Sequence, residues 1–409
     1  MISQRRNRIS SFARRAAHLI ALALLVLPLC ACSVAETLLD TTGGPEVTPS
    51  DGSVVVIQDT ERPAETPETA EEDALPALGE SETPAPSEEP AQSVSSTTGR
   101  PLPDGSVYRP VLVVMDNAAQ SRPQTALMLA DVVYEFPLDR TDHTTRFLAV
   151  FADEIPTRVG PVCDSRAYIA DIALEWDGLY VSAGDPAELT DGYSLLADSG
   201  LRFTADYSGS AIPYFYTDKT VTSAEGHTLF FKALDYADAN YNFSTAQSDA
   251  RFSFESGVSY EKGKSFTSVG LPFTSSDADR VVFTYDAATN LLTRSDKNSK
   301  NVLGVSKSLT PTDNALGYES VPITVQNLIV QYVRVSSFDS LYRTVEVTGN
   351  GDCVYFINGK YISGHWSRPS LSEVTSYTLY DGTPVRLEPG TTWIELMPTK
   401  HEIKIRNDS

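Results

Sequence analysis

Charged side chains gather at the ends of three apolar runs in the first half of the folded part of the chain. Those able to do acid–base or ion-pair chemistry are Asp116, Arg122, Asp131, Glu135, Arg146 and Arg166. Paired carboxylates about 5 to 9.5 Å apart hydrolyse glycans, and carboxylates beside Arg bind polar ligands. Arg also forms bidentate bonds with carboxylates in purely structural networks. The sequence therefore predicts either a charged ligand site or ion pairs that fix the strand ends.

Two other residues have side chains suited to ligand contact. His227, in Gly226-His227-Thr228, is a candidate base beside these acids, although a lone His after a loop is also typical of a helix start. Trp366 follows a predicted hairpin and has His365 and Arg368 nearby. If exposed, Trp366 would stack on a sugar ring; the alternative is burial against the next strand.

Standard catalytic and metal-binding motifs are absent from the sequence. No HExxH, GxSxG, Walker or GxGxxG pattern occurs, and the five histidines lack metal-ligand spacing. Cys163 and Cys353 have no CxxC spacing, so we expect two separate thiols, with a bridge between them as the alternative. The sequence thus predicts no cofactor and no metal, and it assigns no catalytic residue.

Buried strands are predicted to position the charged residues. The apolar runs 111–115, 131–136 and 146–151 are bounded by turn-forming residues, as buried strands are. Further elements expected in this region are a short helix at 124–129, a helix at 165–176, a strand at 179–182, and helices from Pro186 to about Asp198 and at 229–239. Residues 101–245 are therefore interpreted as an α/β domain.

The C-terminal region has the pattern of an antiparallel β domain. Strands are expected at 280–285, 291–294, 328–335, 353–357, 360–363, 377–380, 384–387 and 392–396. Asn358-Gly359 and Asp381-Gly382 predict tight hairpin turns. Residues 246–275 are expected to join the two domains, with the β-rich domain at 276–406. The fold class is predicted as α+β: an α/β sandwich followed by a mainly antiparallel β domain.

The N-terminus has the features of a lipoprotein export signal. Residues 1–31 contain five arginines and no acid, followed by an apolar segment too short to span a bilayer comfortably. Cys32 follows Ala31, as the lipidated cysteine follows a small residue in a bacterial lipobox, so Cys32 is the predicted lipidation site. An ordinary secretory signal or an uncleaved anchor is the alternative.

Residues 32–100 have the composition of a disordered acidic tether. They contain 15 acidic residues, two Arg, eight Pro and no aromatic residue. Such a segment cannot bury enough apolar surface to offset the entropy lost on ordering. The whole chain has a formal net charge of −22. This charge argues against nucleic-acid binding, which requires a basic surface.

Motifs in both halves resemble the YerB-like family (domain of unknown function 3048), lipoproteins of Gram-positive bacteria. The matching residues are Arg109-Pro110, Met115-Asp116-Asn117, Arg122-Pro123-Gln124, residues 130–135, Thr145-Arg146-Phe147, Gly160-Pro161-Val162, Arg166, Tyr168, Asn358-Gly359-Lys360, Gly364, Trp366, Pro389-Gly390 and Thr392-Trp393-Ile394. The resemblance covers about residues 105–400. It implies an α/β sandwich followed by a mainly β part, with no assigned activity.

This chain departs from the family's pattern at several polar positions. Cys163 stands where the family has Arg, Gly226-His227-Thr228 replaces Pro-His-Asn, and Ser182 replaces a His. An acidic position before the Thr-Arg pair is less distinct, with Asp139 and Asp142 as candidates. These departures argue against a conserved catalytic site.

The sequence thus predicts a lipoprotein anchored to the outer face of the cytoplasmic membrane of a Gram-positive bacterium. Its expected role is non-catalytic binding of a cell-wall or envelope-protein ligand. One alternative is a cell-wall glycan or peptide hydrolase that uses Glu135 or Asp131 with His227. Another is a scaffold for an envelope complex. The ligand-site hypothesis comprises Asp116, Arg122, Asp131, Glu135, Arg146, Arg166, His227 and Trp366.

Overall fold

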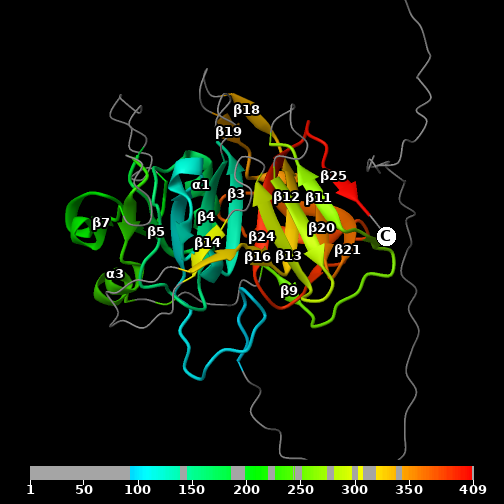
Figure 1. Ribbon diagram of the computed structural model, residues 1–409, viewed down its shortest axis with the longest axis horizontal. Helices are drawn as coiled ribbons and strands as arrows, with labels where there is room; N and C mark the ends of the chain where they lie inside the picture. Colours follow the sequence, from blue (N-terminus) through cyan, green and yellow to red (C-terminus); the bar gives the residue numbers. More distant parts are fainter. Residues whose placement is uncertain are drawn as a thin grey trace, which may run out of the picture. The chain divides into compact units, whose positions relative to one another are not determined.

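The structure is a computed structural model (Figure 1). It describes residues 93–138, 145–185, 199–219, 226–242, 244, 251–273, 281–296, 303–306, 319–337 and 343–407. All of them belong to one compact unit, residues 49–409. The described part is mostly β-strand with few helices, in agreement with a β-rich second half. The α/β sandwich expected for the first half stays a prediction.

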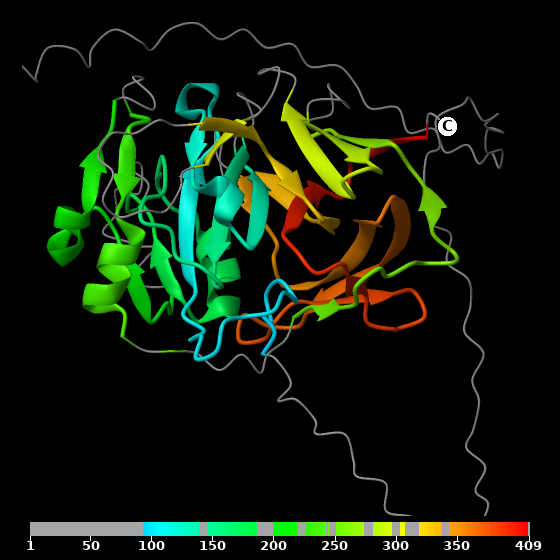
Figure 2. The same ribbon diagram turned by 60° about the horizontal axis from the view of Figure 1, so that its bottom comes forward.

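An 11-stranded sheet forms the centre of this unit (Figures 1 and 2). Its strand order is β10-β21-β20-β17-β24-β3-β4-β1-β5-β6, with β22 paired to β21. The bounds are β1 Val111–Asp116, β3 Val132–Pro137, β4 Thr145–Phe151, β5 Leu179–Val181, β6 Phe203–Ala205, β10 Lys264–Ser265, β17 Asn327–Val333, β20 Gly349–Ile357, β21 Lys360–Arg368, β22 Ser376–Leu379 and β24 Thr392–Pro398.

Strands from the two predicted domains are neighbours within this sheet. β24, near the C-terminus, pairs in parallel with β3, so that Ile394 lies opposite Tyr134 and Glu395 opposite Glu135. On its other side β24 pairs in parallel with β17. The predicted joint at 246–275 therefore does not divide the sheet, which runs through both halves.

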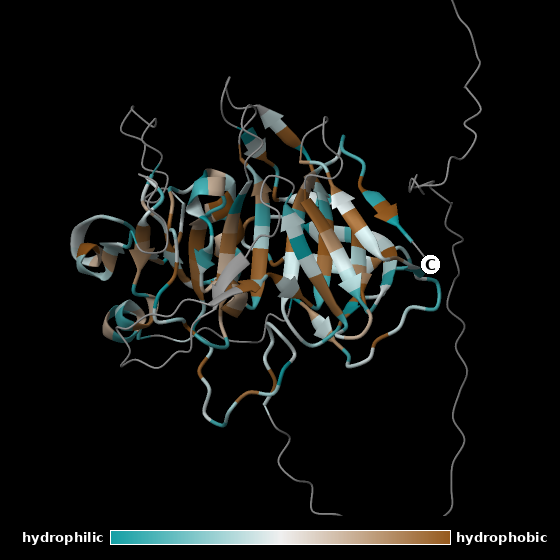
Figure 3. Ribbon diagram, in the orientation of Figure 1, coloured by the Kyte–Doolittle hydropathy of each residue, from teal (hydrophilic) through white to brown (hydrophobic). Residues whose placement is uncertain are grey.

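Both faces of the central sheet are covered by apolar side chains. Val113 and Met115 of β1 belong to one buried cluster, and Leu112 and Val114 belong to the other, as strand alternation requires. Figure 3 shows these central strands coloured as hydrophobic. Burial on both faces explains why β1, β3 and β4 are almost continuously apolar.

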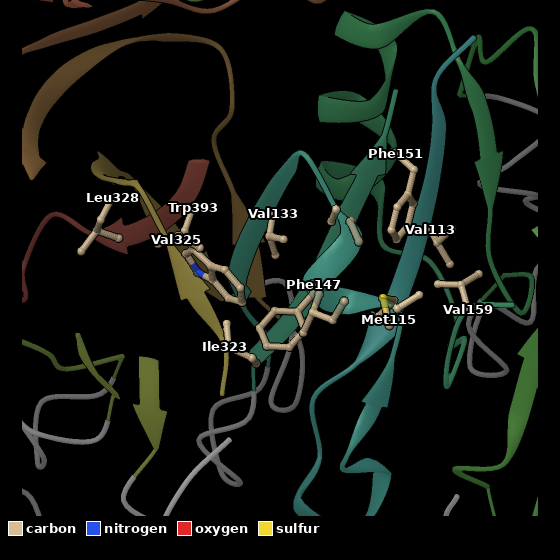
Figure 4. Close-up of a cluster of buried hydrophobic side chains, with 14 of the residues drawn as sticks. Val113, Met115, Val133, Phe147, Phe151, Val159, Ile323, Val325, Leu328 and Trp393 are labelled. Carbon is tan, nitrogen blue, oxygen red and sulfur yellow. The ribbon is translucent and has the colours of Figure 1, made fainter. Parts of the chain in front are cut away.

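A short helix covers one face and a small second sheet covers the other. Helix α1 (Ala167–Ala173) continues as the 3-10 helix η3 (Leu174–Trp176), and both contribute to one apolar cluster. The five-stranded sheet β16-β13-β12-β11-β25 contributes to the other cluster. There the Trp393 ring packs against that of Phe147 (Figure 4). The ring centroids of Trp393 and Phe147 are 5.2 Å apart, and those of Trp393 and Phe283 are 6.0 Å apart.

Smaller elements complete the described part. The strands are β2 Gln124–Thr125, β7 Phe215–Thr217, β8 Leu229–Phe231, β9 Ser253–Phe254, β11 Ser268–Leu271, β12 Val281–Asp286, β13 Leu291–Asp296, β14 Leu303–Ser306, β15 Glu319–Pro322, β16 Thr324–Val325, β18 Val335–Ser337, β19 Arg343–Val345, β23 Arg386–Leu387 and β25 Lys404–Arg406. The helices are η1 Ala119–Ser121, η2 Leu127–Leu129, η4 Gly209–Tyr214 and α3 Ala233–Asn240.

Elements with strong local patterns lie where the sequence predicts them. The three apolar runs correspond to β1, β3 and β4, and the helix predicted at 165–176 corresponds to α1 and η3. Asn358 and Gly359 have φ of 48° and 72°, the left-handed geometry that a type I′ hairpin requires. These features depend on neighbouring residues alone.

Predictions were wrong for segments whose structure depends on contacts with residues distant in the sequence. The helix expected at 229–239 begins only at Ala233, because Leu229–Phe231 pairs with β7 as strand β8. Residues 124–129 form β2 and η2 rather than one helix. Residues 392–396, expected in an antiparallel meander, form the parallel strand β24. The helix predicted beyond Pro186 lies outside the described residues.

Candidate functional site

Several strands of the central sheet end together at what we call the carboxyl edge, where β1 ends at Asp116, β3 at Pro137 and β5 at Val181. β1 and β5 are parallel, and β1 and β3 are both antiparallel to β4, so all three run in one direction. Ligands of open α/β sheets bind outside such carboxyl ends. This edge is therefore the first place to look for a site.

Asp116 and His227 form a pair at the carboxyl edge. His227 Nδ1 contacts Asp116 Oδ2, and Asp116 Oδ1 accepts a hydrogen bond of 3.0 Å from the Ala118 backbone N–H. The His227 side chain is 28% exposed and the Asp116 side chain 13%. Both groups thus remain partly accessible to solvent.

A second group of ion pairs lies beside Asp116 and His227. Arg146 of β4 lies directly opposite Asp116 where β1 and β4 pair. Arg146 Nη1 donates to the Asp164 backbone carbonyl at 2.6 Å and lies 3.1 Å from the Asp164 carboxylate. Arg166 Nη1 contacts the same carboxylate and donates to the Ser165 carbonyl at 2.8 Å. Asp164 is 31% exposed. One partly exposed carboxylate thus links two largely buried arginine side chains.

Opposing effects of burial and neighbouring charge set the ionisation of this group. Burial acts to raise the pKa of Asp164, but Arg146 and Arg166 outweigh it and lower that pKa. Burial acts to lower the pKa of Arg146, and its negative neighbours reverse this and raise it. Burial raises the pKa of the Cys163 thiol well above its ordinary value. Cys163 is therefore a neutral thiol rather than an activated nucleophile.

We call Asp116, Arg146, Asp164, Arg166 and His227 the carboxyl-edge cluster. Asp116, Arg146 and Arg166 were predicted as site residues because polar side chains gather at the ends of the apolar runs, and His227 was predicted as a candidate base beside such acids. Asp164 was missed, although it lies between Cys163 and the predicted helix at 165–176. The cluster presents fixed positive and negative groups together. Such an arrangement is suited to binding a polar ligand, because Arg gives directional bonds to anions and Asp accepts from donors.

Arg122 points away from this cluster, into a buried region where strands of the first and second halves of the chain meet. We call this region the junction. Its Nη2 donates to the Asn117 backbone carbonyl at 2.9 Å and to Asp296 Oδ2 at 3.0 Å. The Arg122 and Asp296 side chains are 9% and 2% exposed. Burial lowers the pKa of Arg122, against the opposing attraction of Asp296. Arg122 thus connects β1 to β13 rather than a ligand to the protein.

Glu135 lies deeper in the same junction. Arg294 donates to its two carboxylate oxygens at 2.7 and 3.0 Å, and Thr145 Oγ1 donates at 2.6 Å. The Glu135 and Arg294 side chains are fully buried. Glu395 of β24 lies beside Glu135 in register and is also fully buried. We call Arg122, Glu135, Arg294, Asp296 and Glu395 the junction network.

Three members of the junction network were not predicted. Arg294, Asp296 and Glu395 belong to the second half, whereas the expected site residues before Trp366 all belong to the first. A usable signal existed for Glu395, which stands between Ile394 and Leu396 in an otherwise apolar strand. A charged residue within a strand buried on both faces must find a polar partner inside the protein.

Asp131 lies at the other end of the strands, opposite the carboxyl edge. It precedes β3, and its Oδ2 accepts hydrogen bonds from the backbone N–H groups of Ala152 and Asp153 at 2.6 and 2.9 Å. Burial, together with the negative charge of Asp153, raises the pKa of Asp131 to about 7. Four strand positions separate Asp131 from Glu135, roughly 13 Å at the usual rise.

The hypothesis that Trp366 contacts a sugar ring is wrong. Trp366 is 2% exposed, and its Nε1 donates to the Tyr332 carbonyl at 2.8 Å. It lies within the long strand β21, on the face that packs into an apolar cluster, while its neighbour His365 faces solvent. Strand alternation therefore buries the indole.

The predicted site residues thus do not line one shared cleft. Asp116, Arg146, Arg166 and His227 lie together; Arg122 and Glu135 are buried at the junction; Asp131 is at the other edge. The hydrolase alternative needed Glu135 or Asp131 beside His227. Glu135 is instead enclosed by Arg294, and His227 is paired with Asp116. This geometry removes the support for that alternative.

The described residues contain neither a disulfide nor a group of side chains suited to a metal ion. Cys163 and Cys353 are both free, and no group of His, Cys, Asp and Glu there is arranged to hold a metal ion. Among the same residues, no helix is long and apolar enough to cross a membrane. The predicted signal, the lipidation site Cys32 and the tether up to residue 92 lie outside them. The prediction of a disordered tether up to residue 100 is wrong for its last part, because residues 93–100 are ordered and Ser95, Thr97 and Thr98 are buried.

Comparison with known proteins identifies relatives of both halves. Two family models of a protein of unknown function, DUF3048, match this chain. The model of the family's N-terminal domain matches residues 97–246, and the model of its C-terminal domain matches residues 269–394. A Bacillus subtilis (strain 168) protein named "Putative lipoprotein YerB" is 26% identical over 310 residues, covering 71% of this chain and 81% of that protein. The crystal structure of YerB protein from Bacillus subtilis has a TM-score of 0.60 at 22% identity, covering 77% of this chain and 100% of that one. The structural likeness shows a shared fold.

Proposed function

This chain belongs to the DUF3048 family, and from that premise we propose that it is a lipid-anchored, extracytoplasmic binding protein without catalytic function. Its ligand is a polar component of the cell wall or an envelope protein. The observation that carries this proposal is the carboxyl-edge cluster, where charged side chains from separate segments converge and where Asp116, Asp164 and His227 stay partly exposed.

The anchor is supported by the sequence and by the relative's name. Cys32 follows Ala31 after a basic and then apolar segment, and the B. subtilis relative is named as a lipoprotein. Two or more acyl chains on Cys32 hold a protein stably on a membrane, whereas a single chain gives only marginal binding. The protein would therefore be retained on the outer face of the cytoplasmic membrane.

The tether gives the folded part reach above that membrane. A flexible chain of its length has an end-to-end distance of roughly 45 Å, and Pro and charge extend it further. That distance allows the binding domain to search part of the wall while anchored. The acidic tether also suits a position away from the anionic lipid surface.

The anchor is tested by metabolic labelling of the full chain with a radioactive fatty acid in a Gram-positive host. The wild-type protein is expected in the membrane fraction with label, and Cys32→Ser is expected without label and released from the membrane. Cys353→Ser is the matched control, because Cys353 is a free buried thiol that lies far from the signal in the sequence. Labelling that persists in C32S would contradict the proposed anchor.

The binding role is tested with isolated wall material and with chemical crosslinking to envelope proteins in intact cells. We expect the combined substitution of Asp116→Asn and Arg166→Gln to weaken retention at least tenfold, because it removes one charge of each sign at the carboxyl edge. Glu346→Gln, an exposed acid elsewhere, is the control. Equal retention of both proteins would remove the carboxyl-edge cluster as the site; crosslinks to one envelope protein would identify a protein ligand instead of wall.

A further inference from the structure

A cavity of about 760 Å³ lies at the edge of the sheet opposite the carboxyl edge. It is formed where Arg109 precedes β1, Asp153 follows β4, and Leu234 projects from α3. Its volume is within the range of small-molecule sites, about 300 to 1,000 Å³. None of the residues predicted from the sequence as a ligand site lines it, so it is a separate feature.

Acidic groups line one part of the cavity. Asp153 is held in place because its two carboxylate oxygens accept hydrogen bonds from Ser95 Oγ at 2.5 Å and Thr98 Oγ1 at 2.6 Å. Each oxygen of an ionised carboxylate has a second lone pair, so Asp153 can accept another donor. Glu154 beside it is exposed. Together they form a position for a primary ammonium group.

A positive group lines another part. The Arg109 guanidinium donates to the Tyr241 carbonyl at 2.9 Å and to Asp238 at 2.8 Å, and lies 5.9 Å from the Tyr241 ring centre. These contacts fix its orientation. Because a guanidinium has five N–H donors, Arg109 retains donors for a carboxylate of a ligand.

Apolar side chains complete the lining. Val107, Ile155 and Leu234 all contribute, and Val107 is 62% exposed, among the most exposed of the large hydrophobic residues described. An apolar ligand group placed against them would remove this surface from water. The cavity thus offers an anion, a cation and an apolar surface at once.

We propose that this cavity binds a short peptide of two to four residues with free ends. Its amino group lies against Asp153 and Glu154, an apolar side chain packs on Val107, Ile155 and Leu234, and its terminal carboxylate lies at Arg109. This site is independent of the carboxyl-edge cluster, and it takes a different ligand from the wall or protein surface proposed there.

The test is isothermal titration of the tripeptide Leu-Gly-Leu into residues 32–409 carrying Cys32→Ser, which keeps the whole compact unit. Saturable binding with a Kd on the order of 0.1 to 1 mM is expected for so small a ligand. N-acetyl-Leu-Gly-Leu lacks the ammonium group, and Ser-Gly-Ser lacks the apolar side chains; each should bind at least about tenfold more weakly. Absence of saturable binding by Leu-Gly-Leu would overturn the proposal, as would equal binding by the acetylated peptide.

Two exposed positions supply variants that keep the fold. Glu154→Gln and Val107→Ser should each weaken Leu-Gly-Leu binding about three- to tenfold, because neither side chain is buried and each contributes one contact. Glu346→Gln, a distant exposed acid, should bind as the parent does. If all three variants bind alike, the peptide occupies another place and the assignment of this cavity is wrong.

Discussion

The carboxyl-edge cluster and the junction network contain the same residue types but have different roles in the protein. At the carboxyl edge, Asp164 is 31% exposed, although the side chains of its partners Arg146 and Arg166 are only 8% and 11% exposed. At the junction, Glu135 and Arg294 are fully buried. Solvent reaches the Asp164 carboxylate and the His227–Asp116 pair, so these groups can exchange a partner for a ligand, whereas full burial makes the second group costly to disturb. Burial rather than residue type therefore separates a candidate site from a structural bond between the halves.

Removal of Arg294 from the junction network is expected to have the largest effect. Arg294→Met should lower the free energy of unfolding by about 3 to 5 kcal/mol, because it leaves the Glu135 charge buried without its bidentate partner. Urea denaturation of residues 32–409 measures the change, with the exposed Arg334→Met as control. A loss below about 1 kcal/mol would mean that water reaches the junction network.

A titration at the opposite edge is expected to have the next largest effect. The pKa of Asp131 is raised to about 7, so the folded state holds its proton more tightly than the unfolded state does, and stability falls as pH rises from about 4 to 7. Asp131→Asn removes this dependence while keeping an acceptor for the Ala152 and Asp153 N–H groups. At pH 8 it should stabilise the protein by up to about 4 kcal/mol relative to wild type.

Measured at pH 4 and pH 8, the gain from Asp131→Asn should be present only at the higher pH. The exposed Asp235, on helix α3, supplies the control through Asp235→Asn. A gain equal at both values would show that Asp131 does not titrate in this range.

The carboxyl edge is expected to show the opposite pH dependence with a smaller magnitude. The pKa of Asp164 is lowered by Arg146 and Arg166, so its stabilising contribution is present above about pH 4 and is lost as pH falls. Asp164→Asn should therefore destabilise by roughly 1 kcal/mol at pH 7, since the carboxylate is partly exposed. Thermal unfolding at pH 7 and pH 3 tests this, and a loss that persists undiminished at pH 3 would contradict it.

Sequence alone predicts the local part of this architecture and misses the non-local part. The apolar runs of β1, β3 and β4 and the Asn358-Gly359 turn identify their elements, because periodicity and turn geometry depend on adjacent residues. The pairing of β24 with β3 depends on residues more than 250 positions apart, for which the sequence has no local pattern.

The same limit explains the candidate site. Asp116, Arg146 and Arg166 could be grouped because strand ends of one sheet meet, and His227 was added as a candidate base beside such acids; the structure pairs it with Asp116. Glu135 carried the same pattern yet is buried, because its partner Arg294 comes from the second half. The exposure of Trp366 depended on which face of β21 packs inward, which required knowing what covers the sheet.

The smallest expected effect is that of Glu395→Gln, which tests whether Glu135 or Glu395 carries the negative charge of the junction network. Glu135 and Glu395 are the same residue type, lie in register on neighbouring strands and are equally buried, yet Arg294 donates both of its carboxylate hydrogen bonds to Glu135. Burial and the adjacent Glu135 charge raise the pKa of Glu395 well above its ordinary value, so Glu395 is the neutral acid of the pair. Glu395→Gln replaces a neutral group with a neutral group of equal shape, so at pH 4 it should change stability by less than about 1 kcal/mol. Above about pH 4 the unfolded chain releases the Glu395 proton while the folded chain keeps it, so the variant should gain stability over the wild type as pH rises from there. Glu135→Gln removes the charge that Arg294 requires and should cost about 3 kcal/mol or more. Urea denaturation of the two variants side by side decides the assignment: equal losses would mean that the two carboxyls share the charge, and a larger loss for Glu395→Gln would mean that the roles are reversed.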